Sequence, residues 1–397
     1  MNIAILIPEL GGGGAERVAQ IVGNHYFERG EKVYYFLADN TTQQEYPVKG
    51  QVINTGIKGG SWDDSTGYYK AMGTLIKSSL IMRKFKWKYH IDVAISFMEE
   101  FNYINVLSKG REKVVTRICT VLSQQGDFKG PLYSKKMINS LYNLSDIIIV
   151  MSNYVKEDMY KVYGISLAKM YKIPNPAIRY AEIEPGKRWE YGDKSVICIG
   201  RLMKVKQQER IIRAFSYVKF HCVEASLIIL GIGPNKKYLE NLCKKYGIEN
   251  SVHFIGFTNN TGFYLKNSRV FVMASSVEGF PNSMVEAMAH GLPVVTTNCP
   301  GACGEIVGGK NIQDTDLKIQ YCKYGILTPY ISGKIRAEEK LSEQEKQLGE
   351  GILSILNNDE LYDKYAKQSL KRASMYRLEK VMMRWDKVVE SERRNIK

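Results

Sequence analysis

The chain has 397 residues, of which 44% are hydrophobic, and it carries a formal net charge of +15. This length predicts two domains of ordinary size, and the hydrophobic content is enough for two cores, which excludes a disordered chain. No apolar run reaches the roughly 18 residues that span a bilayer, and the first residues pass directly into a strand pattern, so we expect a cytoplasmic protein without a signal peptide.

Apolar, β-branched runs alternate with helical patterns throughout the amino-terminal half. The runs cover residues 2–8, 32–38, 92–98, 113–118 and 146–152. Strands that alternate with helices indicate an α/β fold with a doubly wound sheet. The proline-containing segment IPNPA, residues 173–177, indicates the exit from this domain, which is predicted to span residues 1–178.

The glycine-rich loop GGGGAER, residues 11–17, follows the first strand and opens a helix. Together with Asp39 at the end of the second strand, it imitates a dinucleotide-binding fingerprint. The third glycine of that fingerprint would fall on Glu16 or Arg17, whose bulk prevents close packing of helix on strand. A plain flexible turn is one alternative for this loop. Its candidate functional residues are Gly12, Gly13 and Gly14.

Residues 75–90 (LIKSSLIMRKFKWKYH) combine basic and aromatic side chains. These are Lys77, Arg83, Lys84, Lys86 and Lys88, with Phe85, Trp87 and Tyr89. Such a face suits an anionic membrane leaflet, where each cation contributes about 1 kcal/mol. Nucleic acid would be attracted by the same charges, but no helix-turn-helix, zinc or RNA-binding motif accompanies them. We therefore expect an anionic membrane surface and no nucleic acid as a partner, with an ordinary solvated helix end as the alternative.

The carboxyl-terminal half repeats the alternating pattern. Strands are predicted near residues 195, 226, 252, 270 and 293, and helices follow after about residue 340. Residues 179–377 are expected to form the second domain. Residues 376–395 contain no proline or glycine and predict one final helix.

Two cations follow the first strand of this half, in ICIGRLMKVKQ at residues 197–207. Arg201 and Lys206 are five positions apart at the end of the strand, where both can meet one diphosphate. A charge pair of this kind is more often a solvated surface feature, so it indicates little by itself.

The segment EGFPNSMVEAMAHGLPVVT, residues 278–296, brackets a helix start with two carboxylates. Asn282 or Ser283 is the predicted N-cap, and Gly291 suits a left-handed residue at the helix end. Unpaired amides in the first turn, together with the helix dipole, offer an anion site at the carboxyl end of the preceding strand. These amides are predicted at Ser283, Met284 and Val285.

Glu278 and Glu286 can flank an extended, hydroxyl-rich ligand, because each carboxylate accepts two or more hydrogen bonds from a diol. The alternative is a capping box, in which Glu286 binds the amide of the N-cap residue Ser283.

Two further motifs compete with this interpretation. Asp314, Thr315 and Asp316 spell a D-x-D metal motif, but no apolar strand precedes it, so a solvated loop is expected. The seven cysteines are scattered singly, and Cys299 and Cys303 lack zinc-finger spacing. We expect all of them to be reduced and structural.

The E-x7-E pattern from Glu278 to Glu286 resembles the signature of the family 4 retaining glycosyltransferases of the GT-B fold. The family's other landmarks occur here in the same order, in residues 144–164, 173–177, 197–207, 225–234 and 251–258. The resemblance covers nearly the whole chain and is strongest from about 195 to 310. In the family a glycine usually follows the lysine that corresponds to Lys206. This chain has Gln207 at that position, so the family pattern does not predict the conformation of the turn here.

The resemblance implies two Rossmann-like domains that face a cleft, with a terminal helix at about 378–397 that crosses back to the first domain. The first domain would bind the acceptor and the second the nucleotide sugar, with the loops of 225–234 and 251–258 along the base. The implied catalytic residues are Arg201, Lys206 and Glu278. The implied donor-binding residues are Gly200, Gly279, Phe280, Pro281, Asn282, Ser283, Met284, Val285 and Glu286.

On the acceptor side, the resemblance points to the glycine loop of residues 12–14 and to polar residues at strand ends. The latter are Ser96, Glu99, Asn102 and Arg117. Many relatives place a histidine near the acceptor, but His25 and His90 receive no such role here, and His290 is expected to interact with the carboxyl end of its own helix.

The expected reaction is transfer of a sugar from a nucleotide sugar, most simply a UDP-sugar, to a hydroxyl of a lipid-linked glycan, with retention and without a metal cofactor. The setting would be bacterial surface polysaccharide synthesis at the inner face of the plasma membrane. A nucleotide-sugar epimerase of the same fold is the nearest alternative, followed by a non-catalytic sugar-nucleotide-binding protein and an oxidoreductase.

Overall fold

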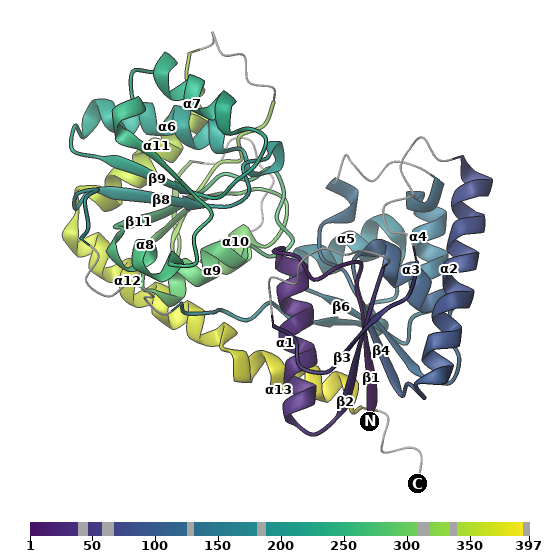
Figure 1. The fold of residues 1–397 in the computed structure, drawn as a ribbon. Helices are drawn as coiled ribbons and strands as arrows, with labels where there is room; N and C mark the ends of the chain where they lie inside the picture. The colour runs from purple at the N-terminus through teal and green to yellow at the C-terminus, as the bar shows by residue number, and fades with distance from the viewer. Residues whose placement is uncertain are drawn as a thin grey trace. The chain divides into compact units, whose positions relative to one another are not determined.

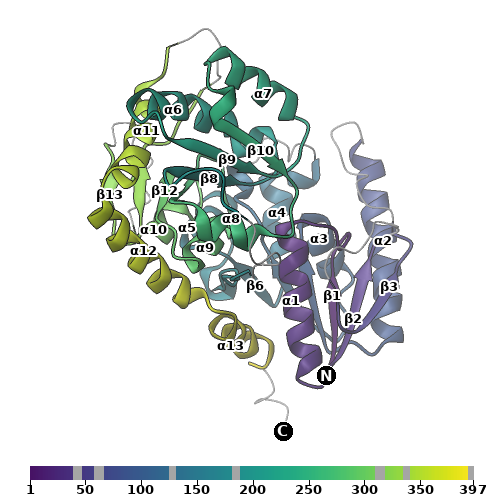
Figure 2. The same ribbon diagram turned by 60° about the vertical axis from the view of Figure 1, so that its left-hand side comes forward.

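A computed structural model describes residues 1–38, 47–57, 67–124, 131–180, 188–308, 318–333 and 340–391. These residues divide into two compact units, Met1–Asn175 with Glu379–Lys397 and Pro176–Leu378. The division lies close to the predicted boundary at residue 178. Each unit has its own seven-stranded sheet and its own hydrophobic core (Figures 1 and 2).

The sheet of the first unit is parallel throughout, with strand order β3-β2-β1-β4-β5-β6-β7. Its strands are β1 (Asn2–Leu6), β2 (Lys32–Leu37), β3 (Gln51–Asn54), β4 (Val93–Phe97), β5 (Lys113–Arg117), β6 (Ile147–Val150) and β7 (Met170–Lys172). Its α-helices are α1 (Gly14–Glu28), α2 (Tyr68–Lys88), α3 (Glu99–Leu107), α4 (Lys135–Tyr142), α5 (Asn153–Tyr163) and α13 (Leu378–Val389), and the 3-10 turns are η1 (Leu122–Gln124), η2 (Pro131–Tyr133) and η3 (Leu167–Lys169).

The last helix completes the core of this first unit. Trp385 of α13 is fully buried and its ring lies 6.4 Å from that of Phe97 on β4. Figure 1 shows α13 beside α1, and His25 of α1 forms a 2.9 Å contact with Asp386. The helix is shorter than the predicted 376–395, because extended backbone at Arg377 separates it from the preceding turn.

The second unit has strand order β10-β9-β8-β11-β12-β14-β13, parallel except for the last pair. Its strands are β8 (Ser195–Ile199), β9 (Ser226–Leu230), β10 (Val252–Gly256), β11 (Val270–Met273), β12 (Val294–Thr297), β13 (Gln320–Tyr321) and β14 (Ile326–Thr328). Its α-helices are α6 (Gln208–His221), α7 (Lys236–Lys245), α8 (Thr261–Asn267), α9 (Asn282–Ala289), α10 (Cys303–Val307), α11 (Glu343–Leu356) and α12 (Asp359–Ala373), and its 3-10 turns are η4 (Lys204–Lys206), η5 (Glu249–Ser251) and η6 (Ser374–Tyr376).

The ten predicted strands all form, which confirms the doubly wound α/β architecture. The strands β3, β7, β13 and β14 are additional, and each of them lies at or next to a sheet edge. They were missed because they have only two to four residues, too few for a periodic signal.

The strand order of the parallel strands changes direction between β1 and β4 in the first unit and between β8 and β11 in the second. Ligands of open α/β sheets bind outside the carboxyl ends of the strands at such a switch point. The loops that follow these four strands are therefore where a functional site is expected.

Candidate functional site

In the second unit, the loops after β8 and β9 run in close contact. A β-carbon on Gly231 would lie 2.0 Å from the carbonyl oxygen of Gly200, and one on Gly233 would lie 2.4 Å from that of Leu202. Both glycines are therefore required for this approach, whereas Gly200 has ordinary space around it. The two loops therefore pack backbone against backbone on either side of Arg201, one of the predicted phosphate-binding residues.

The turn that carries the two cations ends in a left-handed residue. Gln207 has φ +48° and ψ +39°, a conformation that glycine adopts without strain. The turn nevertheless forms with glutamine, so the departure from the family pattern leaves it intact. The side chain of Gln208 then donates to the carbonyl of Arg201 at 2.9 Å and fixes the start of the turn.

The loop after β11 is tied to this turn. The amide of Ser276 donates to the carbonyl of Val205 at 2.8 Å. One oxygen of the Glu278 carboxylate receives the Lys206 ammonium at 2.6 Å and the Ser275 hydroxyl at 2.7 Å. The structure thus brings two of the three predicted catalytic residues into direct contact at the switch point.

The Lys206–Glu278 pair is partly shielded from water, with 26% of the lysine side chain and 9% of the glutamate side chain exposed. Burial opposes the charge of Lys206, but attraction to the Glu278 carboxylate outweighs it and raises the pKa of the ammonium. Lys206 is therefore held as a cation at neutral pH. Arg201 is exposed, so its guanidinium is accessible to a ligand.

The backbone of Glu278 is fixed by a glycine from the loop after β12. A β-carbon on Gly301, which has φ +127°, would lie 1.6 Å from the Glu278 carbonyl oxygen. The Glu278 amide donates to Pro300, and its carbonyl accepts from Ala302, each at 3.0 Å. The carboxylate is consequently presented from a rigid segment and not from a free loop.

Helix α9 begins one residue earlier than predicted, at Asn282, with Pro281 as the N-cap residue and no side-chain cap bond. Neither Asn282 nor Ser283 is therefore the N-cap, and the capping box of Ser283 with Glu286 does not form. The amide of Val285 donates to the carbonyl of Pro281 at 3.3 Å, which removes it from the predicted anion site. In the described part of the chain, the amides of Ser283 and Met284 remain available for an anion.

The other predicted donor residues line the same loop and helix. Gly279 and Phe280 follow Glu278, and the Phe280 ring packs edge-on against Tyr376 at 5.4 Å. Glu286 is 6% exposed, so only a ligand seated against the helix can reach it. The Met284 and Val285 side chains are fully buried and belong to the core.

Two exposed apolar residues that the sequence analysis did not single out lie at neighbouring strand ends. Ile232 follows β9 and is 60% exposed, and Phe257 follows β10 and is 65% exposed. A flat, apolar group such as a nucleobase can pack on such side chains. The signal was present in the sequence, since both residues directly follow a strand-end glycine.

In the first unit, the glycine loop leads into α1 at the switch point. Gly13 is the N-cap residue, and a β-carbon there would lie 2.1 Å from the Glu16 carboxylate, so a larger residue would displace that side chain. Gly14 is the first helical residue. Asp39, the residue paired with this loop in the dinucleotide hypothesis, lies outside the described residues.

Glu99, on the other side of this switch point, is the first residue of α3 and is only 5% exposed. It follows Met98, whose φ of +70° is unusual for a residue with a side chain. Its Oε1 has no hydrogen-bond partner among the described residues. Burial raises the pKa of Glu99 to about 7, so this carboxyl group titrates near neutral pH.

Ser96, Asn102 and Arg117 do not face open space, contrary to expectation. The Asn102 side chain accepts from the Ser96 hydroxyl at 2.8 Å and donates to the Arg117 carbonyl at 3.0 Å and the Tyr142 hydroxyl at 2.9 Å. The Arg117 guanidinium is buried and donates to the Asn175 side chain. These residues join strands and helices inside the unit; among the four predicted acceptor residues, Glu99 Oε1 and Arg117 Nε have no hydrogen-bond partner in the described part of the chain.

The comparisons with known proteins agree with this geometry. Residues 180–313 match the sequence profile of the family described as glycosyl transferases group 1. A glycosyltransferase of Methanocaldococcus jannaschii is 33% identical over 279 residues, which cover 66% of this chain and 68% of that relative. The chain belongs to the group 1 glycosyltransferases. The predicted family is therefore confirmed.

A second relative aligns with almost the whole transferase. It is the N-acetylgalactosamine-N,N'-diacetylbacillosaminyl-diphospho-undecaprenol 4-alpha-N-acetylgalactosaminyltransferase of Campylobacter jejuni, which is 26% identical over 383 residues and is matched over 94% of this chain and 95% of its own.

Solved structures confirm the GT-B fold. Sucrose-phosphate synthase from Thermosynechococcus elongatus superposes with a TM-score of 0.77 at 15% identity, covering 98% of both chains. HepE from Anabaena, in complex with UDP and glucose, gives a TM-score of 0.71 at 17% identity and covers 98% of this chain and all of its own.

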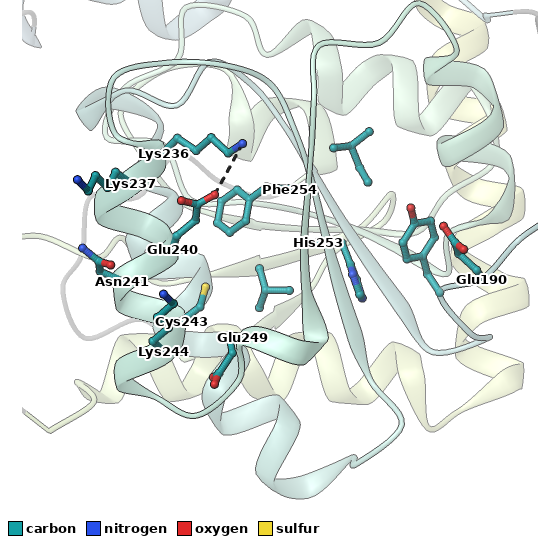
Figure 3. Close-up of a pocket in the computed structure, with 13 residues that line it drawn as sticks. Glu190, Lys236, Lys237, Glu240, Asn241, Cys243, Lys244, Glu249, His253 and Phe254 are labelled. Atoms are coloured by element: carbon teal, nitrogen blue, oxygen red, sulfur yellow. Dashed lines mark ion pairs between the residues drawn. The ribbon is translucent and has the colours of Figure 1, made fainter.

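A cavity of about 860 Å³ lies elsewhere in the transferase, between α7 and the edge strand β10 (Figure 3). Lys236, Glu240 and His253 are among its lining residues, and a 3.7 Å ion pair joins the first two. The residues of the switch-point site do not line it, and its mixed charges indicate no particular ligand.

The imidazole of His290 has a partner outside its own helix. Its Nε2 accepts a hydrogen bond from the amide of Tyr180 at 3.0 Å, and the two rings stack at 6.3 Å. With Nε2 as the acceptor, the imidazole proton lies on Nδ1, so the interaction expected with the carboxyl end of α9 stays a prediction.

The described residues contain seven free cysteines, and the sulfur atoms of Cys299 and Cys303 lie 3.4 Å apart. No group of three histidine, cysteine or acidic residues that could hold a metal occurs within the described ranges. The D-x-D motif at residues 314–316 lies outside them. None of the described helices is long and apolar enough to cross a bilayer.

Proposed function

We propose that this glycosyltransferase moves a sugar from a UDP-sugar to a hydroxyl of a lipid-linked glycan, with retention at the anomeric carbon and without a metal ion. The contact between Lys206 and Glu278 at the switch point carries the proposal, because it joins a phosphate-binding cation to a hydroxyl-binding carboxylate. The names of the C. jejuni relative, with its undecaprenol acceptor, and of HepE with UDP support the acceptor and donor classes.

Arg201 and Lys206 would hold the donor diphosphate, and the amides of Ser283 and Met284 in the first turn of α9 would donate to it. As the bond from the anomeric carbon to the diphosphate breaks, negative charge develops on the departing oxygen. These cations and amides stabilise that charge. The same oxygen accepts the proton of the acceptor hydroxyl, whose oxygen forms the new bond on the same face of the sugar.

Glu278 has two functions in this scheme. In the free enzyme it keeps the Lys206 ammonium in place, and it accepts hydrogen bonds from sugar hydroxyls when the donor enters. Glu286 would hold the ribose diol. The exposed side chains of Ile232 and Phe257 would pack against the base.

The acceptor would bind at the switch point of the first unit, near the loop of residues 12–14 and Glu99. Ser96, Asn102 and Arg117 would support this site from inside the unit and not contact the acceptor. The setting we propose is bacterial surface polysaccharide synthesis, with the enzyme at the cytoplasmic face of the membrane and no nucleic acid as partner.

The test compares Arg201→Ala and Glu278→Ala with Lys204→Ala, which removes an exposed cation from the same turn. The first two variants should lose roughly 100- to 1000-fold in transfer rate, the effect of removing one group that stabilises developing charge. Lys204→Ala should keep nearly full activity, and all three variants should be folded, as a cooperative unfolding transition would verify. Unchanged turnover in Arg201→Ala or Glu278→Ala would contradict the assignment.

The epimerase alternative makes a different prediction. An epimerase converts its nucleotide sugar without an acceptor and without net release of nucleoside diphosphate. Incubation with UDP-, GDP- and ADP-sugars, alone and with lipid-linked acceptors, therefore separates the two reactions. Thermal stabilisation by one of these sugars identifies the donor independently of turnover.

A further inference from the structure

The outer side of α2 carries an apolar stripe. Tyr69, Ile76, Leu80 and Trp87 are 88%, 52%, 58% and 79% exposed. Their separations of seven, four and seven residues place them on one side of the helix. The stripe extends for roughly 27 Å at a rise of 1.5 Å per residue. Exposed apolar residues scattered singly are ordinary, but four of them on one side of a single helix indicate a binding surface.

This stripe is not the face that holds α2 to its own unit. The opposite side buries Ala71, Leu75 and Met82. Phe85 packs against Phe36 of β2 with 5.7 Å between the ring centres. In Figures 1 and 2, none of the other helices and strands described for the same unit covers the outer side of α2. The helix is therefore already anchored, and the stripe is additional to its packing.

Cations border the stripe, and α2 contains no acidic residue. Lys77, Arg83, Lys84 and Lys88 are exposed. Lys86 is not part of this surface, contrary to the sequence-based expectation, because its ammonium is buried against Glu112 at 2.8 Å. The charge of the outer face is thus of one sign and lies beside apolar side chains.

We propose that this face of α2 seats the enzyme on an anionic lipid bilayer, with the apolar stripe in the interfacial region and the four cations at the lipid headgroups. A long convex ridge with a tryptophan and charges of one sign suits a fluid anionic surface. The inference deepens the proposed function by naming the surface that brings the enzyme to a lipid-linked acceptor. Its test needs neither donor nor acceptor, so it can fail while the transferase assignment stands.

The experiment is sedimentation of the full chain with vesicles of phosphatidylethanolamine and phosphatidylglycerol, and with vesicles of phosphatidylcholine alone. The wild type should bind the anionic vesicles more tightly. The charge variant Arg83→Gln/Lys84→Gln/Lys88→Gln should lower the partition coefficient roughly 100-fold, at about 1 kcal/mol per cation. The control Lys237→Gln/Lys244→Gln/Lys245→Gln removes the same charge from α7 and should change it only a few-fold.

The apolar variant Ile76→Ser/Leu80→Ser/Trp87→Ser tests the stripe separately. It should abolish the part of the binding that survives high salt, since burial of apolar side chains is not screened. Quenching of tryptophan fluorescence by brominated lipid should occur in the wild type and be largely lost in Trp87→Phe.

Three results would overturn the proposal. The first is no binding to anionic vesicles, and the second is binding that neither triple variant weakens beyond the α7 control. The third is a dimer in light scattering that the apolar variant dissociates, because the stripe would then be covered by a second copy of the chain. All substituted side chains are exposed, and unchanged unfolding temperatures would verify that the variants are folded.

Discussion

Lys206 and Lys86 each pair with a buried carboxylate, but 26% of the Lys206 side chain is exposed and only 3% of that of Lys86. The family resemblance, and not the charge pair alone, implied that Arg201 and Lys206 bind the donor; the structure leaves Arg201 exposed and joins Lys206 to Glu278. Lys86 looked equally available, yet it is buried against Glu112. No local pattern separates these two lysines, because the partner carboxylate in each case comes from a distant segment.

Glu99 illustrates the same limit and leads to a prediction about stability and pH. Its pKa is raised by burial from 4.5 to about 7, so the folded state binds a proton more tightly than the unfolded chain. Stability is therefore highest at low pH with respect to this group and falls as the pH rises from about 4.5 through 7. Between pH 4.5 and 8 the wild type should lose roughly 3 kcal/mol through this group, and Glu99→Gln should not.

Urea unfolding at a series of pH values measures this difference. Glu100→Gln is the matched control, since it removes the neighbouring, less buried carboxyl group and leaves Glu99 in place. It should show the pH dependence of the wild type. Parallel curves for the wild type and Glu99→Gln would show that the carboxyl group is solvated and not buried.

At the scale of elements, long apolar runs were predicted correctly and short or strained ones were not. The central strands of both sheets are buried on both sides and therefore consist mainly of apolar residues, with one serine each in β4 and β9. The edge strands are shorter, and α9 begins at Asn282 because Pro281 supplies the carbonyl that pairs with Val285. Turn geometry of this kind depends on backbone contacts that a single sequence does not reveal.

The left-handed turn at Gln207 gives a prediction for this scale. A residue with a β-carbon costs about 1–2 kcal/mol in this conformation, whereas glycine costs less but loses more chain entropy on folding. Gln207→Gly should therefore raise the free energy of unfolding of the second unit by up to about 1 kcal/mol. Urea or thermal unfolding measures the change.

Lys204→Gly provides the comparison, because Lys204 lies in the same turn without a positive φ. It should lower stability by roughly 0.5–1 kcal/mol. If both glycine substitutions destabilise to the same extent, the strain at Gln207 is absent in solution.

For the whole molecule, the alternation of strands and helices was enough to predict two doubly wound units. The family resemblance predicted in addition that the last helix joins the first unit. This helix, α13, supplies buried residues to the core of the first unit and therefore contributes to the stability of that unit. The first unit is therefore incomplete until the last helix has been made. The sequence showed the helix but not its length, since the break at Arg377 is a backbone feature.

Trp385→Ala should consequently destabilise the first unit and leave the second unchanged. Removal of a fully buried tryptophan costs about 3–5 kcal/mol. Hydrogen exchange separates the units: opening of β1 and β4 should become about two to four orders of magnitude more frequent, and exchange in β8 and β11 should not change. Met383→Ala, on the same helix but 56% exposed, should leave exchange in both units near that of the wild type. Equal acceleration in both sheets would mean that the units unfold as one cooperative body.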